Sequence, residues 1–532
     1  MGLLLRIRAL ALVLGRGAAR GGPFLRRAGW VLVGLGLAAY LVFVTSRMGL
    51  CAGGSDSSGY VNGARMLREG RLVAEQRQLE GVAVPLPDFT YVPLGFVPVA
   101  REPGGRGAPP MSPSYPLGLP ALFVAASCGG SLEAGMHVAM TLMLVGSLVV
   151  TYRLGRLLGL EPVWALVGVG MLAGCPLFLG LSVQTMSDMP ALFWTTLALV
   201  LALESRRRRW MAGAAGVAVA IAVFVRPANA LVVLPLVWAL GLDWRRWLWL
   251  GLAGLPGAVL WALMNKVLFG HYIATGYGDV SRLFGWHNVL PALRNYGETC
   301  ARILPLGVLA ALATTRGGRG ADPRATAAAA TWVVLVGGFY CFYQHTQEVW
   351  WYLRFVLPAF PALIVLAVGG LRQVHGWLAG PGHVWRLGLA GAVVVTLLGW
   401  QLARQVRACE EWWVLWWGEG ELRYVELCRR LETHAPANAV VFAMQTSGAL
   451  FSLQPWVVVR RDCMTPELSR ELYAAAGRAG RPVFAALFPF ELAEGCFGKN
   501  LAGRWVKIDA VDDKTLWRLD DPAGAMPTVA VP

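Results

Sequence analysis

Long apolar runs separated by short polar segments recur along the chain, and eleven of them approach the length that a helix needs to cross a bilayer. They cover residues 28–45, 132–152, 161–181, 189–204, 210–225, 228–242, 246–264, 299–314, 325–344, 354–371 and 386–402. One further apolar segment, residues 115–127, is shorter and contains two prolines, which is typical of a re-entrant or interfacial segment. The pattern predicts a polytopic α-helical membrane protein with about eleven transmembrane helices.

The composition supports a membrane protein, because 56% of the 532 residues are hydrophobic and only 15% are charged. The net charge of +16 would also suit a nucleic-acid-binding protein. The arginines, however, cluster in short blocks between the apolar runs, as in the cytoplasmic loops of membrane proteins. The basic charge therefore indicates topology, and no nucleic-acid partner is predicted.

The basic blocks fix a topology. If the N-terminus is cytoplasmic, strict alternation of the eleven spans places every clear basic block on the cytoplasmic side. These blocks are Arg153 with Arg156, Arg206 to Arg209, Arg245 with Arg246, Arg316 to Arg324 and Arg372 to Arg386. Nearly all basic residues are arginine, which fits a GC-rich bacterial genome. The prediction is a multi-pass protein of the bacterial cytoplasmic (inner) membrane with an external, periplasmic C-terminus.

The same topology divides the chain into three parts. Residues 1–27 form a basic cytoplasmic N-terminus, residues 28–402 form the transmembrane domain with a first external loop at 46–131, and residues 403–532 form an external segment. This last segment alternates helical and strand-like stretches, which predicts a small α/β domain. It contains no nucleotide fingerprint, P-loop or recognisable catalytic triad.

The nine cysteines show no CxxC motif and no Cys/His spacing of a zinc site. Cys463 and Cys496 could form a disulfide if the C-terminal segment lies in an oxidising compartment, and the sequence leaves this open.

Two acids lie at predicted helix starts on the external side. Asp56, in GGSDSSGYVNGARMLREGRL, begins an amphipathic helix that we expect to lie in the membrane interface. Asp188, in SVQTMSDMPALFW, begins a predicted span. Each acid could cap its helix, which would stabilise it by about 1 kcal/mol. Each could instead belong to a functional site.

Two arginines break the positive-inside pattern. Arg226, in FVRPANALVVLPL, and Arg354, in EVWWYLRFVLPAFPAL, are both predicted to be external. They could be snorkelling anchors, or they could bind an anionic head group, because a guanidinium grips phosphate with a bidentate fork. Lys266 and His345 are predicted on the same side.

The ordered set of motifs resembles the GT-C superfamily of membrane glycosyltransferases, especially the bacterial branch related to protein O-mannosyltransferases and aminoarabinose transferases. The resembling segments are SDSSGYVNGARMLREGRL, YPLGLPALF, SDMPALFWTTLAL, VRPANALVVLPL, NKVLFGHYIATGYG, YLRFVLPAFPAL and the later SGALF. The similarity covers most of residues 28–371, and the C-terminal domain more loosely. Each motif is weak alone, but their order and their shared membrane side make the match more specific.

The resemblance implies an enzyme that transfers a hexose or pentose from a polyprenyl-phosphate donor to a lipid, glycan or protein acceptor outside the membrane. It implies that Asp56 is the general base of a single, inverting displacement and that Asp188 is a second catalytic acid. Many relatives carry a second acid directly after the first, where this chain has Ser57. The candidates for contacts with the donor phosphate or the substrate are Arg226, Arg354, Tyr60, Tyr115, Lys266 and His345. Some relatives use a divalent metal, but no ligand cluster appears here, so no cofactor is predicted.

Two other functions compete with this one. A transporter or flippase of lipid-linked sugars would carry charges near the middle of its spans and inverted internal repeats, and neither is apparent. A catalytically inactive GT-C-like scaffold is the other alternative, and the absence of an acid at Ser57 is compatible with it.

Overall fold

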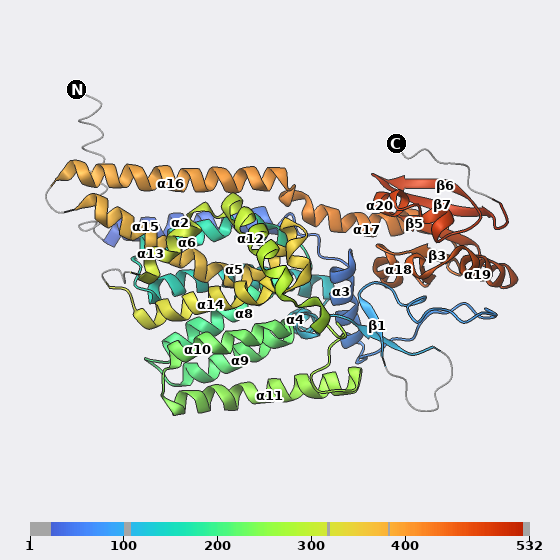
Figure 1. The fold of residues 1–532 in the computed structure, drawn as a ribbon, viewed down its shortest axis with the longest axis horizontal. Helices are drawn as coiled ribbons and strands as arrows, with labels where there is room; N and C mark the ends of the chain where they lie inside the picture. Colours follow the sequence, from blue (N-terminus) through green and yellow to red (C-terminus); the bar gives the residue numbers. More distant parts are fainter. Residues whose placement is uncertain (1–22, 100–107, 316–319, 381–382, 525–532) are drawn as a thin grey trace, which may run out of the picture.

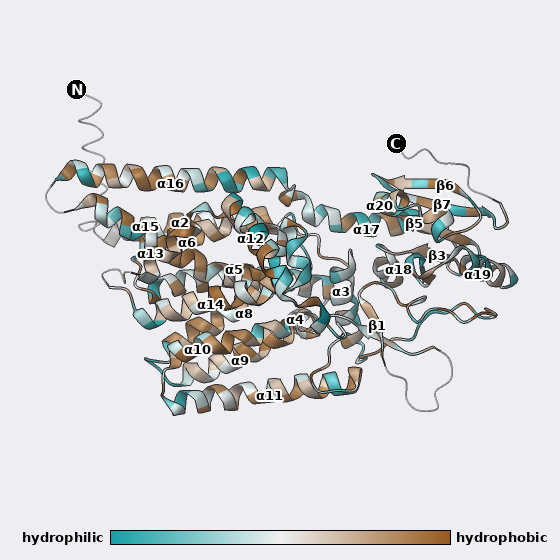
Figure 2. Cartoon of the chain, in the orientation of Figure 1, coloured by the Kyte–Doolittle hydropathy of each residue, from teal (hydrophilic) through white to brown (hydrophobic). Residues whose placement is uncertain are grey.

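The computed structural model describes residues 23–99, 108–315, 320–380 and 383–524. Most of the predicted N-terminal segment 1–27, with Arg316 and Arg319, lies outside these residues. The described chain forms a bundle of helices that run roughly along one direction, followed by a smaller α/β part beyond one end (Figure 1). Figure 2 shows that apolar residues dominate the packed helices and that polar residues are more frequent at the helix ends.

Every predicted span overlaps a helix or a pair of helices. The helices are α2 (Pro23–Thr45), α5 (Leu132–Leu157), α6 (Pro162–Ala173), α7 (Pro176–Ser182), α8 (Asp188–Glu204), α9 (Trp210–Val225), α10 (Val233–Leu240), α11 (Trp244–Phe269), α12 (Val289–Ile303), α13 (Ala310–Thr315), α14 (Pro323–Cys341), α15 (Phe360–Ala379) and α16 (Val384–Glu411). Four 3₁₀ segments lead into them: η1 (Pro227–Val232), η3 (Trp286–Asn288), η4 (Pro305–Leu309) and η6 (Trp350–Ala359).

Fewer helices have the length and composition of a membrane span than the eleven that the sequence predicted. Among the described residues, five helices are long and apolar enough to cross a membrane, or up to seven if each bent pair is one span. Several other helices fall short, because α8 has 17 residues, α9 has 16 and α10 has 8. The count of eleven therefore stays a prediction.

The predicted span 299–314 is wrong as a single helix. The chain bends by 108° between α12 and the segment Pro305–Thr315. Pro305 has no backbone N–H to continue the hydrogen-bond ladder, and the preceding Leu304 has non-helical angles (φ −137°, ψ 56°). α12 is amphipathic, with Ala292, Tyr296, Thr299 and Ile303 on its buried face.

Basic blocks that the sequence placed on one membrane side meet at one end of the bundle. Four ion pairs join segments that are apart in the sequence: Arg153–Glu204, Arg206–Asp322, Arg209–Asp243 and Arg372–Glu161. Arg153 and Arg372 lie within α5 and α15, Glu204 ends α8, and the other partners lie in the connections between helices. The agreement supports the predicted alternation of helix directions.

The opposite end of the bundle carries α3 (Ser55–Arg68), α4 (Gly118–Ser127) and the antiparallel pair β1 (Phe96–Pro98) and β2 (Met111–Pro113). α4 is only ten residues long and is the segment for which a re-entrant or interfacial position was predicted. Gly118 lets α4 approach the end of α9, because a Cβ at this position would lie 2.3 Å from the Phe224 backbone. The loop after α9 thereby lies next to the first external loop.

The C-terminal part contains a five-stranded mixed sheet in the order β4-β3-β5-β7-β6. Its strands are β3 (Val440–Ala443), β4 (Val457–Arg460), β5 (Val483–Leu487), β6 (Arg504–Val511) and β7 (Lys514–Asp521). β3 pairs in parallel with β4 and β5, whereas β7 pairs antiparallel with β5 and β6. The structure thus contains the predicted α/β fold, with β4 as an additional strand.

Both faces of this sheet are covered. Val440 and Phe442 of β3 pack into one hydrophobic cluster, and the alternate residues Val441 and Ala443 pack into another. The helices of this part are α17 (Trp417–Glu432), α18 (Ser447–Leu453), α19 (Pro466–Arg478), α20 (Pro489–Ala493) and the short α21 (Cys496–Lys499). α17 follows α16 closely, so it connects the bundle to the sheet. All nine cysteines, including Cys463 and Cys496, are free thiols.

Candidate functional site

Four charged side chains from separate segments meet at the end of the bundle that carries α3. Asp56 comes from the first turn of α3, Asp188 from the start of α8, Arg226 from the α9–η1 junction and Arg354 from η6. Arg354 Nη2 lies 2.9 Å from Asp56 Oδ2, and Arg226 Nη2 lies 2.8 Å from Asp188 Oδ1. Arg354 Nη1 also lies 3.7 Å from Asp188 Oδ2, so Arg354 connects both acids.

The two acids do not act as helix caps. α3 is preceded by Gly54, which has no side chain, and the Asp56 carboxylate contacts Arg354 instead of the backbone of its own helix. Asp188 is the first helical residue of α8, and its two oxygens face arginines. The capping interpretation of both acids is therefore wrong, although the helix dipole still favours a negative charge at these positions.

The two arginines do not reach water as snorkelling anchors would. Only 11% of each side chain is exposed, and each is paired with an acid. Phe355 lies between them, with its ring centroid 5.2 Å from the Arg354 guanidinium carbon and 5.6 Å from that of Arg226. Trp351 contributes a second ring 5.3 Å from Arg354. These aromatic faces hold the guanidinium groups by cation–π contacts.

Tyr115 completes the surroundings of Asp56. Its hydroxyl donates to Asp56 Oδ1 at 2.5 Å, and its ring lies 5.1 Å from that of Tyr60. Gly59 makes room for this ring, because a Cβ there would lie 2.4 Å from it. Burial and the Asp56 charge raise the pKa of Tyr115, so the phenol stays a donor.

The charge of Asp56 is stabilised by these partners. Burial alone would raise the pKa of the Asp56 carboxyl. The Arg354 charge and the Tyr115 hydrogen bond outweigh burial and hold this pKa below its ordinary value. Asp56 is therefore ionised near neutral pH, and a quarter of its side chain is exposed.

Several polar atoms of the four-residue cluster have no hydrogen-bond partner among the described residues. They are Asp188 Oδ2, Arg226 Nη1 and Arg354 Nε, all of them buried. A buried polar atom without a partner costs about 1 to 3 kcal/mol, and such atoms are few in folded proteins. The cluster therefore has unused hydrogen-bonding capacity for a ligand.

The chain is similar to known membrane glycosyltransferases. Residues 117–268, which include Asp188 and Arg226, match the family described as dolichyl-phosphate-mannose-protein mannosyltransferase. The structure matches that of ArnT from Cupriavidus metallidurans in the apo state with a TM-score of 0.56 and 14% identity, over 94% of this chain and 99% of that one. The chain has the GT-C fold. This is the fold that the resemblance implied.

Two further solved structures were compared with the chain. ArnT bound to undecaprenyl phosphate matches the GT-C chain with a TM-score of 0.54 and 15% identity, over 93% of this chain and 99% of that one. The arabinofuranosyltransferase AftD from mycobacteria matches with a TM-score of 0.49 and 15% identity, over 92% of this chain and 40% of that one. None of the curated proteins compared with the chain matches it.

Two predicted substrate residues of this GT-C chain lie apart from the cluster. Lys266 donates to the Gly270 carbonyl at 3.0 Å and lies over the Tyr272 ring. His345 pairs with Glu348 at 2.7 Å, and its ring packs against Tyr352. Tyr352 in turn stacks on Phe355, so His345 belongs to an outer layer around the arginines.

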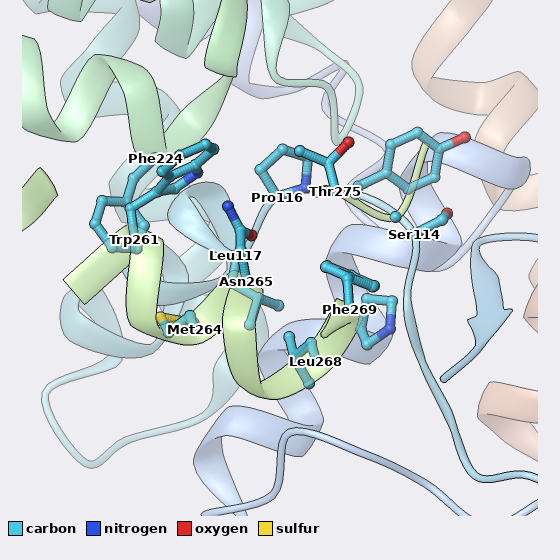
Figure 3. A pocket seen from close by; sticks show the side chains of 13 residues that line it. Ser114, Pro116, Leu117, Phe224, Trp261, Met264, Asn265, Leu268, Phe269 and Thr275 are labelled. Carbon is cyan, nitrogen blue, oxygen red and sulfur yellow. The ribbon is translucent and has the colours of Figure 1, made fainter. Parts of the chain in front are cut away.

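A largely apolar cavity lies beside Tyr115 (Figure 3). Its walls come from residues 113–117, the end of α9, the second half of α11 and residues 275–276. The side chains that line it include Phe224, Trp261, Met264, Asn265, Leu268 and Phe269. α11 runs along the edge of the bundle (Figure 1) and the apolar window of its span is not buried by the rest of the chain. The cavity therefore lies between Tyr115, which contacts the charged cluster, and an apolar helix whose surface the rest of the chain leaves exposed.

Sequence reasoning missed Glu421. This buried residue of α17 accepts a hydrogen bond from Ser57 Oγ at 2.6 Å, directly beside Asp56. In the sequence it begins an amphipathic helix, where an acid would ordinarily face water, so no local signal marks it as buried. In the part of the chain that the structure describes, no group of three or more His, Cys, Asp or Glu residues could hold a metal ion.

Proposed function

We propose that this GT-C chain is a glycosyltransferase that moves a sugar from a polyprenyl-phosphate donor to an acceptor hydroxyl on the external side of the membrane. The observation that carries the proposal is the position of Arg354, which joins Asp56 and Asp188 in one buried cluster. A base and two guanidinium groups within one cluster are what sugar transfer from a phosphate requires.

The proposed reaction is a single displacement. The acceptor hydroxyl oxygen attacks the anomeric carbon of the sugar while Asp56 takes the hydroxyl proton. The bond between the anomeric carbon and the phosphate oxygen breaks, and its electron pair stays on the departing polyprenyl phosphate. Arg226 and Arg354 balance the negative charge that builds up there. One displacement inverts the configuration at the anomeric carbon.

Because Arg354 pairs with Asp56, binding of the donor would also change the basicity of Asp56. In the free enzyme Arg354 lowers the pKa of Asp56, which makes the carboxylate a weak base. A donor phosphate bound by Arg354 would share its guanidinium and weaken its hold on Asp56. The pKa of Asp56 would then rise toward its ordinary range, so the base becomes stronger when the donor is present. Asp188 keeps both arginines oriented during this exchange.

The apolar cavity beside Tyr115 supports a lipid-linked donor. Its walls are mostly hydrophobic and include α11, whose apolar window the rest of the chain leaves exposed, so an isoprenoid chain would approach the cluster along this side. ArnT, whose fold this chain shares, has been solved with undecaprenyl phosphate bound. Tyr60 and Tyr115 would line the sugar or acceptor side of the same site. Lys266 and His345 are left outside the site, because neither contacts the cluster.

The proposal is tested in cells of the host. Mass spectrometry of envelope lipids, glycans and glycosylated proteins from cells with and without the gene should show a sugar that is lost on deletion. Wild type and the control Asp88→Asn, an exposed acid of the same loop, should restore this sugar. Asp56→Asn should accumulate in the membrane but not restore it. Restoration by Asp56→Asn would overturn the proposal.

A further inference from the structure

Glu421 brings a carboxylate from the C-terminal part of the chain to the first turn of α3. Its Oε2 accepts from Ser57 Oγ at 2.6 Å and from the Gly54 backbone N–H at 3.3 Å. Its Oε1 accepts from Gln184 Nε2 at 3.4 Å. A buried acid with three donors around it is held in one position.

This contact replaces a cap that α3 lacks. The first N–H groups of a helix have no partner within the helix, and Gly54 has no side chain that could accept from them. Glu421 Oε2 accepts from the Gly54 N–H, so it takes the place of the missing side-chain cap. Gly53 lets the carboxylate come close, because a Cβ there would lie 1.9 Å from Glu421 Oε2.

The start of α17 is fixed tightly enough to serve this purpose. A Cβ at Gly49 would lie 1.7 Å from the Gly418 carbonyl oxygen, so these two backbones are in direct contact. Trp417 packs on Gly180 of α7, where a Cβ would lie 2.0 Å from the indole ring. Cys51 Sγ also donates to the Glu421 carbonyl. Glu421 is thus attached to the bundle on several sides.

We propose that Glu421 is a positioning residue for Asp56. It holds Gly54, the residue before α3, and Ser57, which follows Asp56 in the first turn, and so keeps the Asp56 carboxylate against Arg354 and Tyr115. Glu421 itself touches no reacting atom. The C-terminal part of the chain is then a component of the reaction centre through α17. This inference rests on the proposed role of Asp56 as the base.

The size of the effect follows from geometry. Without Glu421 the first turn of α3 loses its cap and can fray, which displaces Asp56 relative to the acceptor hydroxyl. A displacement of about 1 Å can cost about 100-fold in rate. The arginines keep their contacts with Asp188, so binding of the donor phosphate should be retained. A positioning role therefore predicts a loss in kcat with little change in KM for the donor.

The test uses the full chain in lipid nanodiscs. The donor is the lipid fraction that accumulates in host cells without the gene, and the binding probe is undecaprenyl phosphate. Glu421→Ala should lower kcat by about 100-fold, and Ser57→Ala by less. Glu421→Gln, which keeps one acceptor oxygen for Ser57, should recover part of the loss. All three should bind undecaprenyl phosphate as wild type does.

The matched control is Glu419→Gln, a half-exposed acid on the same helix that pairs with Arg423. It should leave kcat unchanged. Wild-type kcat in Glu421→Ala and Ser57→Ala would overturn the inference. If Glu421→Ala does not fold, wild-type kcat in both Ser57→Ala and Glu421→Gln would overturn it equally. Asp56→Asn separates the two proposals, because full activity in that variant contradicts the role of Asp56 itself, whatever Glu421 does.

Discussion

Arg354 and Asp56 lie 298 positions apart in the sequence and are joined by a hydrogen-bonded ion pair of 2.9 Å. The pair joins η6, which leads into the apolar helix α15, to the first turn of α3, which lies outside the packed spans. Because Arg354 also reaches Asp188, one guanidinium orders both acids. Arg354 is therefore the residue whose replacement should disturb the site most broadly.

Replacing Arg354 should show whether phosphate binding needs only its positive charge or also its planar guanidinium group. Arg354→Lys keeps one positive charge but loses the planar fork, so we expect binding of undecaprenyl phosphate to weaken by about tenfold, which corresponds to about 1.4 kcal/mol. Arg354→Ala leaves the buried Asp188 and the partly buried Asp56 with one arginine and should also lower the midpoint of thermal unfolding. Arg294→Lys, an exposed arginine 82% open to solvent, is the control. Wild-type binding by Arg354→Lys would contradict the phosphate role.

Tyr115→Phe should change the pH dependence of transfer. The variant removes a hydrogen bond that lowers the pKa of Asp56, so this pKa should rise. Asp56 is active as a base when ionised, and the acidic limb of the kcat/KM profile should therefore move to higher pH. Rates between pH 3 and about 6 would measure it. Tyr272→Phe, at a half-exposed ring, should leave the limb in place, and an unmoved limb in Tyr115→Phe would contradict the interpretation.

Glu421 should make stability depend on pH. Burial, partly offset by the hydrogen bonds from Ser57 and Gly54, raises the pKa of Glu421 from 4.5 to about 7, and the Asp56 charge adds to the rise. The nearby titratable groups are Asp56 on α3, Cys51 in the preceding loop and Tyr424 on α17 itself. The folded state then binds more protons than the unfolded state between these pH values, so stability falls as the pH rises from 4.5 to 7.

Thermal unfolding in nanodiscs at several pH values would measure this loss. The free energy of unfolding should fall by up to about 3 kcal/mol across the interval. Glu421→Gln cannot ionise and should flatten the curve, whereas Glu419→Gln should keep it. A wild-type curve that is flat from pH 4.5 to 7 would show that the Glu421 pKa is not raised.

Charge in an unexpected place was the informative signal in the sequence. Arg226 and Arg354 were identified because they break the positive-inside pattern, and the structure places both in one cluster with Asp56 and Asp188. The capping alternatives could not be excluded in advance, because a local pattern does not show which way a carboxylate points. Only the tertiary contacts with arginines decide it.

Glu421 could not be found in the sequence, because its burial comes from backbone contacts between residues that are far apart, such as Gly49 with Gly418. The predicted span 299–314 was wrong for a related reason. Apolar composition continues through Leu304 and Pro305, and hydropathy does not register the bend that proline imposes. Length and apolarity located the helices well but not their breaks.

The most direct measurement for the central claim is sugar transfer by purified Asp56→Asn in nanodiscs, with binding of undecaprenyl phosphate measured on the same sample. The account predicts that transfer falls by at least about 100-fold, the contribution of a general base, while the variant stays folded and binds the lipid phosphate at least as tightly as wild type. Asp88→Asn should match wild type in both measurements. Transfer by Asp56→Asn at the wild-type rate would contradict the account.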